Sequence, residues 1–359
     1  MKKILIILGI LILILGASVG GVFVYYNNTL KETHGNSNEP VTLIINQGTS
    51  SKGVIDIIYN AGLLKNKYVG YVYIKQHNIN NLQAGEYEVN KGMTFTEILE
   101  KISSGETVDR SFSVTFVEGK RLTYFVNVIS KNFPYTEEEI HDLLENKDYL
   151  QSLIDKHWFL TDEILNDKLY YALEGYLYPS TYYFDVDTSL EDIIDKLLSQ
   201  MGKELSNYKD EIENSEYTVH ELLTMASIVE LEAGINVASY RPGVAGVFYN
   251  RLNSNQSLGS DVTTYYAAQI DMGERDLYQY EIDDINDYNT RPLSKIGLPV
   301  GPISNPSASS IKAAIEPEEN DYFFFVADIK GTVHFTKTNA EHEAKIAELK
   351  RDGLWYVYS

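Results

Sequence analysis

The sequence predicts a mixed α+β protein with one N-terminal transmembrane helix, a small α/β subdomain and a larger α+β domain. Three observations support this prediction. Residues 4–24 carry no charge and are almost entirely apolar. Short alternating segments, typical of strands, are interleaved with capped helical segments further along the chain. The 359 residues, 44% of them apolar, suffice for more than one packed core. We therefore expect a cytoplasmic stub with the anchor (1–26), a linker (27–39), a subdomain (40–106) and a larger domain (107–359).

The apolar run at residues 4–24 predicts a membrane anchor. At about 1.5 Å per residue it forms a helix of roughly 30 Å, the thickness of the hydrocarbon core of a bilayer. Lys2 and Lys3 precede the run, so the positive-inside rule places the N-terminus in the cytoplasm and the rest of the chain outside. The alternative is a cleaved secretory signal with a small-residue site at 17–19. Because the run is longer than the apolar core of a typical signal, we expect an uncleaved anchor in the cell membrane.

Charge and composition exclude several classes of protein. The 51 acidic and 30 basic side chains leave a net charge of −21, whereas a protein that binds nucleic acid presents a basic surface. The chain has no cysteine, which excludes disulfides, thiolate metal sites and a lipid-modified cysteine anchor. Thr224 stands where a second histidine would complete the metal motif that begins at His220 and Glu221. We expect no metal, no cofactor and no nucleic-acid partner.

Hydrophobic periodicity and capping residues place helices and strands in both folded parts. In the subdomain we expect strands at 41–45 and 85–89 and helices at 50–59, 65–76 and 94–102. In the larger domain we expect strands at 111–117, 322–327 and 332–335, and helices at 136–144, 148–156, 190–201, 219–233 and 339–350. Periodicity fades between residues 254 and 307, where Gly, Pro, Asn and Ser accumulate. A long irregular stretch inside a compact domain is typical of a functional loop.

Glu230 lies in a helical segment, 222–233, that is otherwise nearly all apolar. A carboxyl group in apolar surroundings is costly to ionise, so we predict that its pKa is raised toward neutrality, as a general acid requires. At about 100° per residue, Glu230 falls on the apolar arc of the helix and Glu232 on the opposite shoulder of the same arc. Both carboxylates are therefore candidates for burial, and periodicity alone does not choose between them. A position at the rim of the helix, reaching water, is the structural alternative for each.

Polar side chains gather in the irregular stretch. Segments 258–265, 288–290 and 297–306 combine hydroxyl, amide and carboxylate groups and aromatic rings with a Pro- and Gly-rich frame. Such groups on a rigid loop suit a sugar-binding cleft, although each segment alone is also ordinary turn chemistry. The candidates for binding or orienting a substrate are Glu174, Glu232, Ser260, Asp261, Thr263, Tyr265, Tyr288, Asn289 and Asn305.

Six motifs follow one another along the larger domain. They are Leu-Glu-Gly-Tyr-Leu-Tyr-Pro (173–179), Ala-Ser-Ile-Val-Glu (226–230), Val-Ala-Gly-Val-Phe-Tyr-Asn-Arg-Leu (244–252), Leu-Gly-Ser-Asp-Val-Thr (258–263), Tyr-Asn-Thr (288–290) and Gly-Leu-Pro-Val-Gly-Pro-Ile (297–303). In this order they resemble the YceG-like family of endolytic murein transglycosylases, and residues 40–106 resemble a small LysM-like unit in layout. Two positions depart from the family pattern: Val262 replaces a frequent proline and Ala233 a frequent threonine. We expect the missing hydroxyl at 233 to alter the geometry of the site rather than the reaction.

The resemblance implies non-hydrolytic cleavage of the β-1,4 bond between N-acetylmuramic acid and N-acetylglucosamine, which leaves a 1,6-anhydro end. It also implies that Glu230 is the catalytic residue, acting first as acid and then as base. Glu230→Gln should then fold, insert and bind glycan but release almost no product, and Glu232→Gln should be milder. The implied setting is nascent peptidoglycan beside a synthase of the elongation or division machinery, where cutting would limit the length of glycan strands.

Two other functions stay open on the sequence. A hydrolytic muramidase normally needs a second carboxylate, and Glu174, Glu232 or Asp261 could supply it. A non-catalytic scaffold that binds peptidoglycan would use the LysM-like unit and the anchor. Reducing ends in the product would indicate the hydrolase, and a lack of activity on purified strands would indicate the scaffold.

Overall fold

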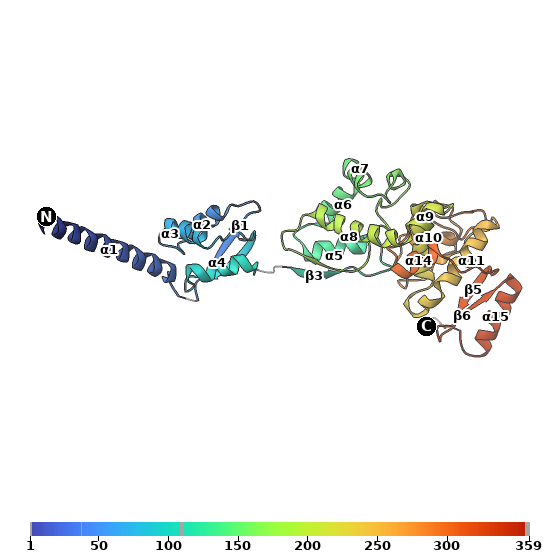
Figure 1. Ribbon diagram of the computed structural model, residues 1–359. Coiled ribbons are helices and arrows are strands. Elements are labelled where there is room, and N and C mark those ends of the chain that lie inside the picture. Colours follow the sequence, from blue (N-terminus) through green and yellow to red (C-terminus); the bar gives the residue numbers. More distant parts are fainter. Residues whose placement is uncertain (1, 37, 108–110, 356–359) are drawn as a thin grey trace. The chain divides into compact units, whose positions relative to one another are not determined.

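The computed structural model describes residues 2–36, 38–107 and 111–355. The chain divides into two compact units, residues 1–110 and 111–359, which are described separately (Figure 1). Each unit contains its own cluster of buried apolar side chains. The mixed α+β class is confirmed, because both units contain helices and short antiparallel strands.

The first unit begins with α1 (Lys2–Lys31), a long apolar helix. Within its stretch Ile7–Lys31, an 18-residue window has a mean hydropathy of 2.7 and is not buried against the rest of the chain, so in length and composition the helix can cross a membrane. The helix continues into the segment 27–39 that we expected to be a linker. Thr29 and Leu30 are buried against the first unit, and this packing extends the helix beyond the apolar run.

Two strands and three helices follow α1 in the order strand, helix, helix, strand, helix. They are β1 (Pro40–Ile45), α2 (Ser51–Asn60), α3 (Lys67–Gln76), β2 (Gly85–Asn90) and α4 (Phe95–Ser104). The two strands pair antiparallel with Leu43 opposite Tyr87. Because side chains alternate along a strand, Leu43 and Ile45 share the buried face with Tyr87 and Val89. The helices begin where short polar side chains accept a backbone N–H, at Ser50, Asn66 and Thr94.

The second unit is largely helical, and its described residues include two antiparallel strand pairs, β3 with β4 and β5 with β6. Its strands are β3 (Phe112–Thr115), β4 (Thr181–Phe184), β5 (Phe324–Ala327) and β6 (Val333–Thr336). Its α-helices are α5 (Leu122–Asn132), α6 (Glu137–Glu145), α7 (Lys147–Lys156), α8 (Leu190–Leu205), α9 (Lys209–Asn214), α10 (Val219–Glu232), α11 (Arg241–Asn253), α12 (Asp261–Ala267), α13 (Gln279–Asp283), α14 (Ala308–Ile315) and α15 (Asn339–Arg351). Short 3-10 helical segments occupy Asp162–Leu165, Ser206–Tyr208 and Ile235–Tyr240, the last of them kinked at Val237.

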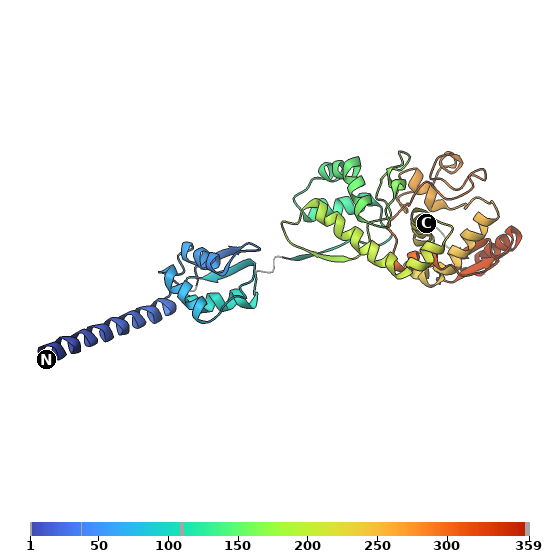
Figure 2. The same ribbon diagram turned by 45° about the horizontal axis from the view of Figure 1, so that its top comes forward.

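Helix α10 is the centre of the second unit. It packs against α14 and α11, and the three helices lie together in both ribbon views (Figures 1 and 2). Every residue from 222 to 230 is buried, which is typical of a helix surrounded by protein on all sides. A capping box, in which Thr218 and Glu221 satisfy each other's backbone N–H groups, fixes its start. The C-terminal end of α10 is therefore held in a fixed place inside the unit.

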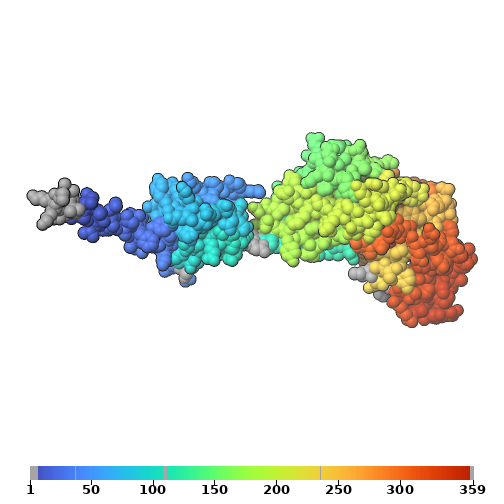
Figure 3. Space-filling view, viewed as in Figure 1, coloured from blue at the N-terminus to red at the C-terminus, as the bar shows by residue number. Residues whose placement is uncertain are grey.

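The C-terminal segment, which consists of β5, β6 and α15, forms a separate part of the surface of the second unit. Helix α15 packs on β5 and β6, and β5 packs on α11. In the space-filling view this segment, drawn in red, makes one end of the unit (Figure 3). The segment thus brings side chains from the last part of the chain beside α11 and the end of α10.

Candidate active site

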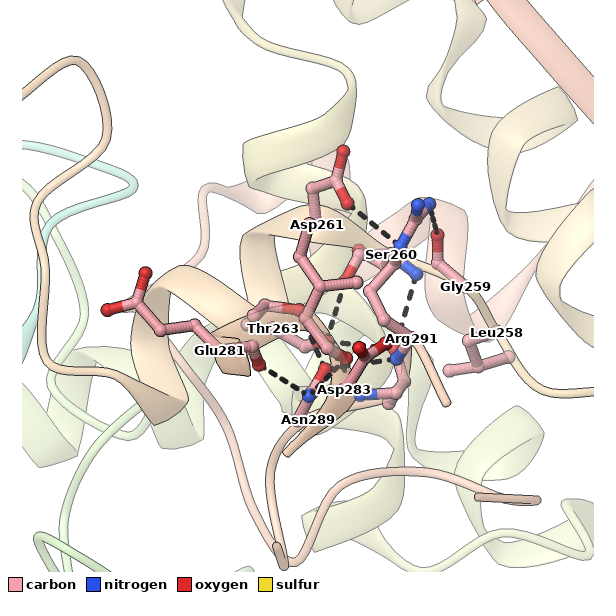
Figure 4. Close-up of polar contacts among 12 residues, drawn as sticks. Leu258, Gly259, Ser260, Asp261, Thr263, Glu281, Asp283, Asn289 and Arg291 are labelled. Atoms are coloured by element: carbon pink, nitrogen blue, oxygen red, sulfur yellow. Dashed lines mark hydrogen bonds and ion pairs between the residues drawn. The ribbon is translucent and has the colours of Figure 1, made fainter. Parts of the chain in front are cut away.

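A polar cleft of about 710 Å³ opens at the C-terminal end of α10. One wall comes from the loop 257–261 and from residues 291–293, and the other comes from β5 and the start of α15. Glu232, the last residue of α10, lies in the lining between Phe248 and Arg251 of α11 and the loop. Several predicted site residues meet here, and Figure 4 shows Ser260, Asp261 and Arg291 side by side in the loop wall.

Glu232 is one of the carboxyl groups that line this cleft, and it is the one at the end of α10. Its Oε1 accepts a hydrogen bond of 2.5 Å from the Ser260 hydroxyl. Burial raises the pKa of Glu232 to about 7, and the negative charge of Asp261 adds to the rise. The hydrogen bond from Ser260 and the positive charges of Arg291 and Arg251 oppose this rise. A carboxylate at the C-terminus of a helix also meets the negative end of the helix dipole, so several contributions favour the protonated acid.

Glu230 has a different environment. Its Oε1 forms a 2.8 Å ion pair with Arg241, and its Oε2 accepts hydrogen bonds from the backbone N–H and the hydroxyl of Ser307 at 2.9 and 2.5 Å. Only 5% of Glu230 and 2% of Arg241 are exposed. The prediction that Glu230 lies in apolar surroundings is therefore wrong. Its charged partner, Arg241, comes from α11, and its hydroxyl partner, Ser307, comes from the start of α14.

Arg241 joins three elements around Glu230. Its Nε donates to the carbonyl of Ala233 at 3.0 Å, and its Nη1 donates to the hydroxyls of Ser307, at 2.7 Å, and Ser309. A buried carboxylate and guanidinium that satisfy each other and further polar groups fix the helices that carry them. This network therefore ties the end of α10 to α11 and α14, and Glu230 is not among the described residues that line the cleft.

Two further arginines shape the cleft wall. Arg251 donates to the carbonyls of Phe323 and Leu258 at 2.7 and 2.9 Å, and its guanidinium lies 4.8 Å from the ring centroid of Phe324. Arg291 pairs with Asp261 at 3.1 Å and donates to the carbonyl of Gly259 (Figure 4). Sequence reasoning assigned no role to these arginines or to Arg241. Arg251 belongs to a motif that the sequence singles out, but its partners become visible only in the fold.

A buried hydroxyl and amide network holds the loop wall from behind. The hydroxyls of Thr263 and Thr290 lie 2.8 Å apart, and Thr263 donates to the Ser260 carbonyl at 2.7 Å. Asn289 accepts from the Thr264 hydroxyl and donates to three backbone carbonyls, those of Glu281, Ile282 and Asp284. Thr263 and Asn289 are fully buried. Of the two predicted roles, contact with substrate and orientation of the site, only the second suits these positions.

Glu174 and Asn305 form a second buried network away from the cleft lining. Glu174 accepts hydrogen bonds from the backbone N–H of Leu122, the hydroxyl of Tyr266 and the amide of Asn305, at 2.8, 3.1 and 3.2 Å. These donors favour the ionised form, but burial outweighs them and raises the pKa of Glu174 to about 8. The network links α5, α12 and the loop before α14, so we interpret it as part of the frame.

The remaining predicted positions also lie in packed surroundings. Tyr288 is buried, and its hydroxyl accepts the backbone N–H of Tyr170 at 3.2 Å. Tyr265 is partly buried and donates to the Arg275 carbonyl at 3.2 Å. Of the predicted substrate-binding residues, the described cleft lining contains Glu232, Ser260 and Asp261. The two departures from the family motifs, Val262 and Ala233, are both buried, and the Ala233 carbonyl serves the Arg241 network.

Comparison with known proteins places the chain in a family. A family model described as the YceG-like family matches residues 43–348, which is most of the chain. The chain belongs to the YceG-like family. This YceG-like chain is 36% identical over 329 residues to a Bacillus subtilis protein named endolytic murein transglycosylase, covering 90% of the chain and 89% of that protein. The resemblance of the six sequence motifs is thereby confirmed.

Two further relatives extend the comparison. A Streptococcus pneumoniae protein of the same name is 30% identical to the YceG-like chain over 350 residues, which is 92% of the chain and 62% of that protein. A crystal structure of a YceG-like protein from Listeria monocytogenes matches with a TM-score of 0.60 at 33% identity, covering 86% of the chain and 99% of the solved one. The family assignment therefore rests on both sequence and fold.

Proposed function

We propose that this protein is a peptidoglycan lytic transglycosylase that α1 anchors to the membrane, with Glu232 as its acid and base. The curated relatives carry the name endolytic murein transglycosylase, and this supports the reaction class. The observation that carries the residue assignment is the position of Glu232 in the wall of a polar cleft with a pKa raised to about 7. A carboxyl group with such a pKa is partly protonated at neutral pH and can donate a proton there.

One titrating group suffices for this reaction. Protonated Glu232 donates its proton to the glycosidic oxygen while the bond from that oxygen to C1 of N-acetylmuramic acid breaks. The 6-hydroxyl of the same sugar then forms a bond to C1 and transfers its proton to the Glu232 carboxylate. The acid is regenerated, and no water is consumed. The hydrogen bond from Ser260 holds the carboxyl group in place for both transfers.

The catalytic role that the family resemblance implies for Glu230 stays a prediction, and the surroundings of Glu230 support it less well. Both oxygens of Glu230 already hold partners, one of them the cation of Arg241. Donation of a proton to a substrate would require this buried ion pair to open. We assign Glu230 to the positioning of the helix end that carries Glu232, two residues further on.

Hydrolysis is the alternative reaction, because Asp261, Asp283 and Glu343 also line the cleft. A muramidase would use one of these carboxylates as nucleophile or to activate water. We expect the purified protein, incubated with glycan strands, to give only 1,6-anhydro ends, measured by mass spectrometry of the products. Reducing ends as the main product would replace the lyase with a hydrolase. A protein that binds strands and cuts none would be a scaffold.

The rate of product release should depend on pH through Glu232. The protonated form starts the reaction, so kcat/KM should fall as the pH rises above about 7, by about tenfold per unit in the limit. The folded pKa of about 7 sets this limb. A series of initial rates between slightly acidic and alkaline pH measures it. A rate that stays constant through neutral pH and falls only far above it would contradict the assignment of Glu232.

The remaining parts of the chain suit a place at the outer face of the membrane. We propose that the N-terminus lies in the cytoplasm, since Lys2 and Lys3 precede the apolar run, and that both folded units lie outside. Residues 40–106, with the order strand, helix, helix, strand, helix, would act as a LysM-like glycan-binding unit. Nascent strands beside a peptidoglycan synthase of the elongation or division machinery would be the substrate, and cutting them would limit their length.

A further inference from the structure

Two exposed tyrosines form a stacked pair at the start of α13, beside the cleft. The rings of Tyr278 and Tyr280 lie 5.6 Å apart between centroids and are within 17° of parallel. Tyr280 is 69% exposed and Tyr278 is 54% exposed. Single exposed aromatic residues are common, but here one exposed ring, Tyr280, is supported by a second ring that stacks on it. We call Tyr278 and Tyr280 the tyrosine platform.

An ion pair holds the tyrosine platform in place. Arg275 forms bonds of 2.6 and 2.9 Å with the two carboxylate oxygens of Glu281, and its guanidinium lies 4.4 Å from the ring centroid of Tyr278. Glu281 also accepts the backbone N–H of Tyr278 at 2.7 Å. These hydrogen bonds lower the pKa of Glu281 to about 2, so the pair stays charged at any working pH. These contacts hold the Tyr278 ring, and Tyr280 stacks on that ring, so the pair is pre-ordered and loses little entropy on binding a ligand.

The tyrosine platform is connected to the cleft wall. Ile282 and Asp283, which follow it in α13, line the cleft. Asn289 ties the backbone at Glu281 and Ile282 to Thr264 of α12, and α12 begins at Asp261 of the cleft (Figure 4). Leu293 continues the apolar surface at the rim, where it is 90% exposed and also lines the cleft. A ligand that leaves the cleft along this wall would meet the platform.

We propose that the tyrosine platform binds a sugar ring of the glycan strand outside the cleft, and so makes the enzyme prefer long strands. This inference rests on the proposed function. The faces of a pyranose ring carry C–H groups, and they pack on flat aromatic rings, while the hydroxyls at the edge of the sugar stay in water. A glycan strand is a continuous row of such rings, so a strand held in the cleft presents further rings to a platform on the same wall.

The test compares Tyr280→Ala with the unchanged full-length protein in detergent. We expect KM for long, peptide-free glycan strands to rise about threefold to tenfold, the effect of losing one aromatic contact. The values of kcat for long strands and of KM for a tetrasaccharide should not change, because a short substrate does not reach the platform. Tyr280→Phe keeps the ring and should behave like the unchanged protein. Tyr183→Ala removes a similarly exposed tyrosine of β4 and serves as the matched control.

A binding measurement separates this proposal from the proposed reaction. In the Glu232→Gln background, sedimentation with insoluble glycan should retain less protein when Tyr280 is also replaced by alanine, and the same amount when Tyr183 is. That result would support the platform even if the products showed a hydrolase. Unchanged retention and unchanged KM in Tyr280→Ala would overturn the platform and leave the reaction intact. Equal losses for long strands and the tetrasaccharide would also overturn it, since they would indicate damage to the cleft.

Discussion

Glu232→Gln should lower the rate of anhydro-product release by about a hundredfold to ten-thousandfold, the usual contribution of a general acid and base. Glutamine keeps the size of the side chain and can still accept the hydrogen bond from the Ser260 hydroxyl, but it has no acidic proton that it could transfer to the glycosidic oxygen. Because the pKa of Glu232 is raised to about 7, much of the group is already uncharged at neutral pH. Replacement by a neutral amide should therefore leave the stability of the second unit nearly unchanged.

Two measurements accompany this variant. The rate is determined from anhydro ends by mass spectrometry, and folding is followed by thermal unfolding of the same preparation. Asp283→Asn, which neutralises another carboxylate of the cleft lining, is the matched control and should retain most of the activity. If Glu232→Gln turns over at the rate of the unchanged protein, Glu232 is not the acid.

Glu230→Gln and Arg241→Met should each destabilise the second unit by about 3–5 kcal/mol, because each leaves one buried charge without its partner. The pair is nearly inaccessible to water, with 5% and 2% of the two residues exposed. It also connects α10, α11 and α14 through Ala233 and Ser307. A loss of this size is a large part of the stability of an ordinary domain, so both variants should also lose activity through unfolding.

Urea unfolding followed by tryptophan fluorescence measures this effect in the correct part of the chain. The protein has two tryptophans, Trp158 and Trp355, and both belong to the second unit. Lys147→Gln breaks the exposed pair with Asp167, in which 73% and 88% of the side chains are accessible, and should change stability by less than about 1 kcal/mol. Normal stability of Glu230→Gln together with a complete loss of turnover would favour a chemical role for Glu230.

Much of the fold follows from local signals in the sequence. Capping residues and periodicity correctly predict the helices that begin near Ser50, Thr94, Thr136, Thr218 and Thr338, because these signals act within a single turn. Strand β4 was missed since its partner β3 lies far away in the sequence. Helix α11 was not predicted as a helix, although it begins with Pro242 in its first turn. Helices α12, α13 and α14 were also missed; the first two are short and lie in the stretch without periodicity.

The candidate site shows more clearly what local sequence signals cannot predict. The sequence indicates that Glu230 and Glu232 are both candidates for burial, and in the structure Glu230 is buried whereas Glu232 is partly buried and lines the cleft. What distinguishes them is the chemistry of partners from other elements: Arg241 and Ser307 for one, Ser260 for the other. Helical periodicity describes one helix, and it contains no information on which cation or hydroxyl the tertiary fold brings to each side chain.

The most direct test of this account compares anhydro-product release by Glu230→Gln and Glu232→Gln, each divided by the amount of folded protein in the assay. Dividing by folded protein removes the effect of the broken Arg241 pair and leaves the effect on chemistry. The account predicts that folded Glu230→Gln retains a substantial part of the normal rate, whereas folded Glu232→Gln retains about a hundredth or less. The opposite order, with an active Glu232→Gln and an inactive but folded Glu230→Gln, would contradict it.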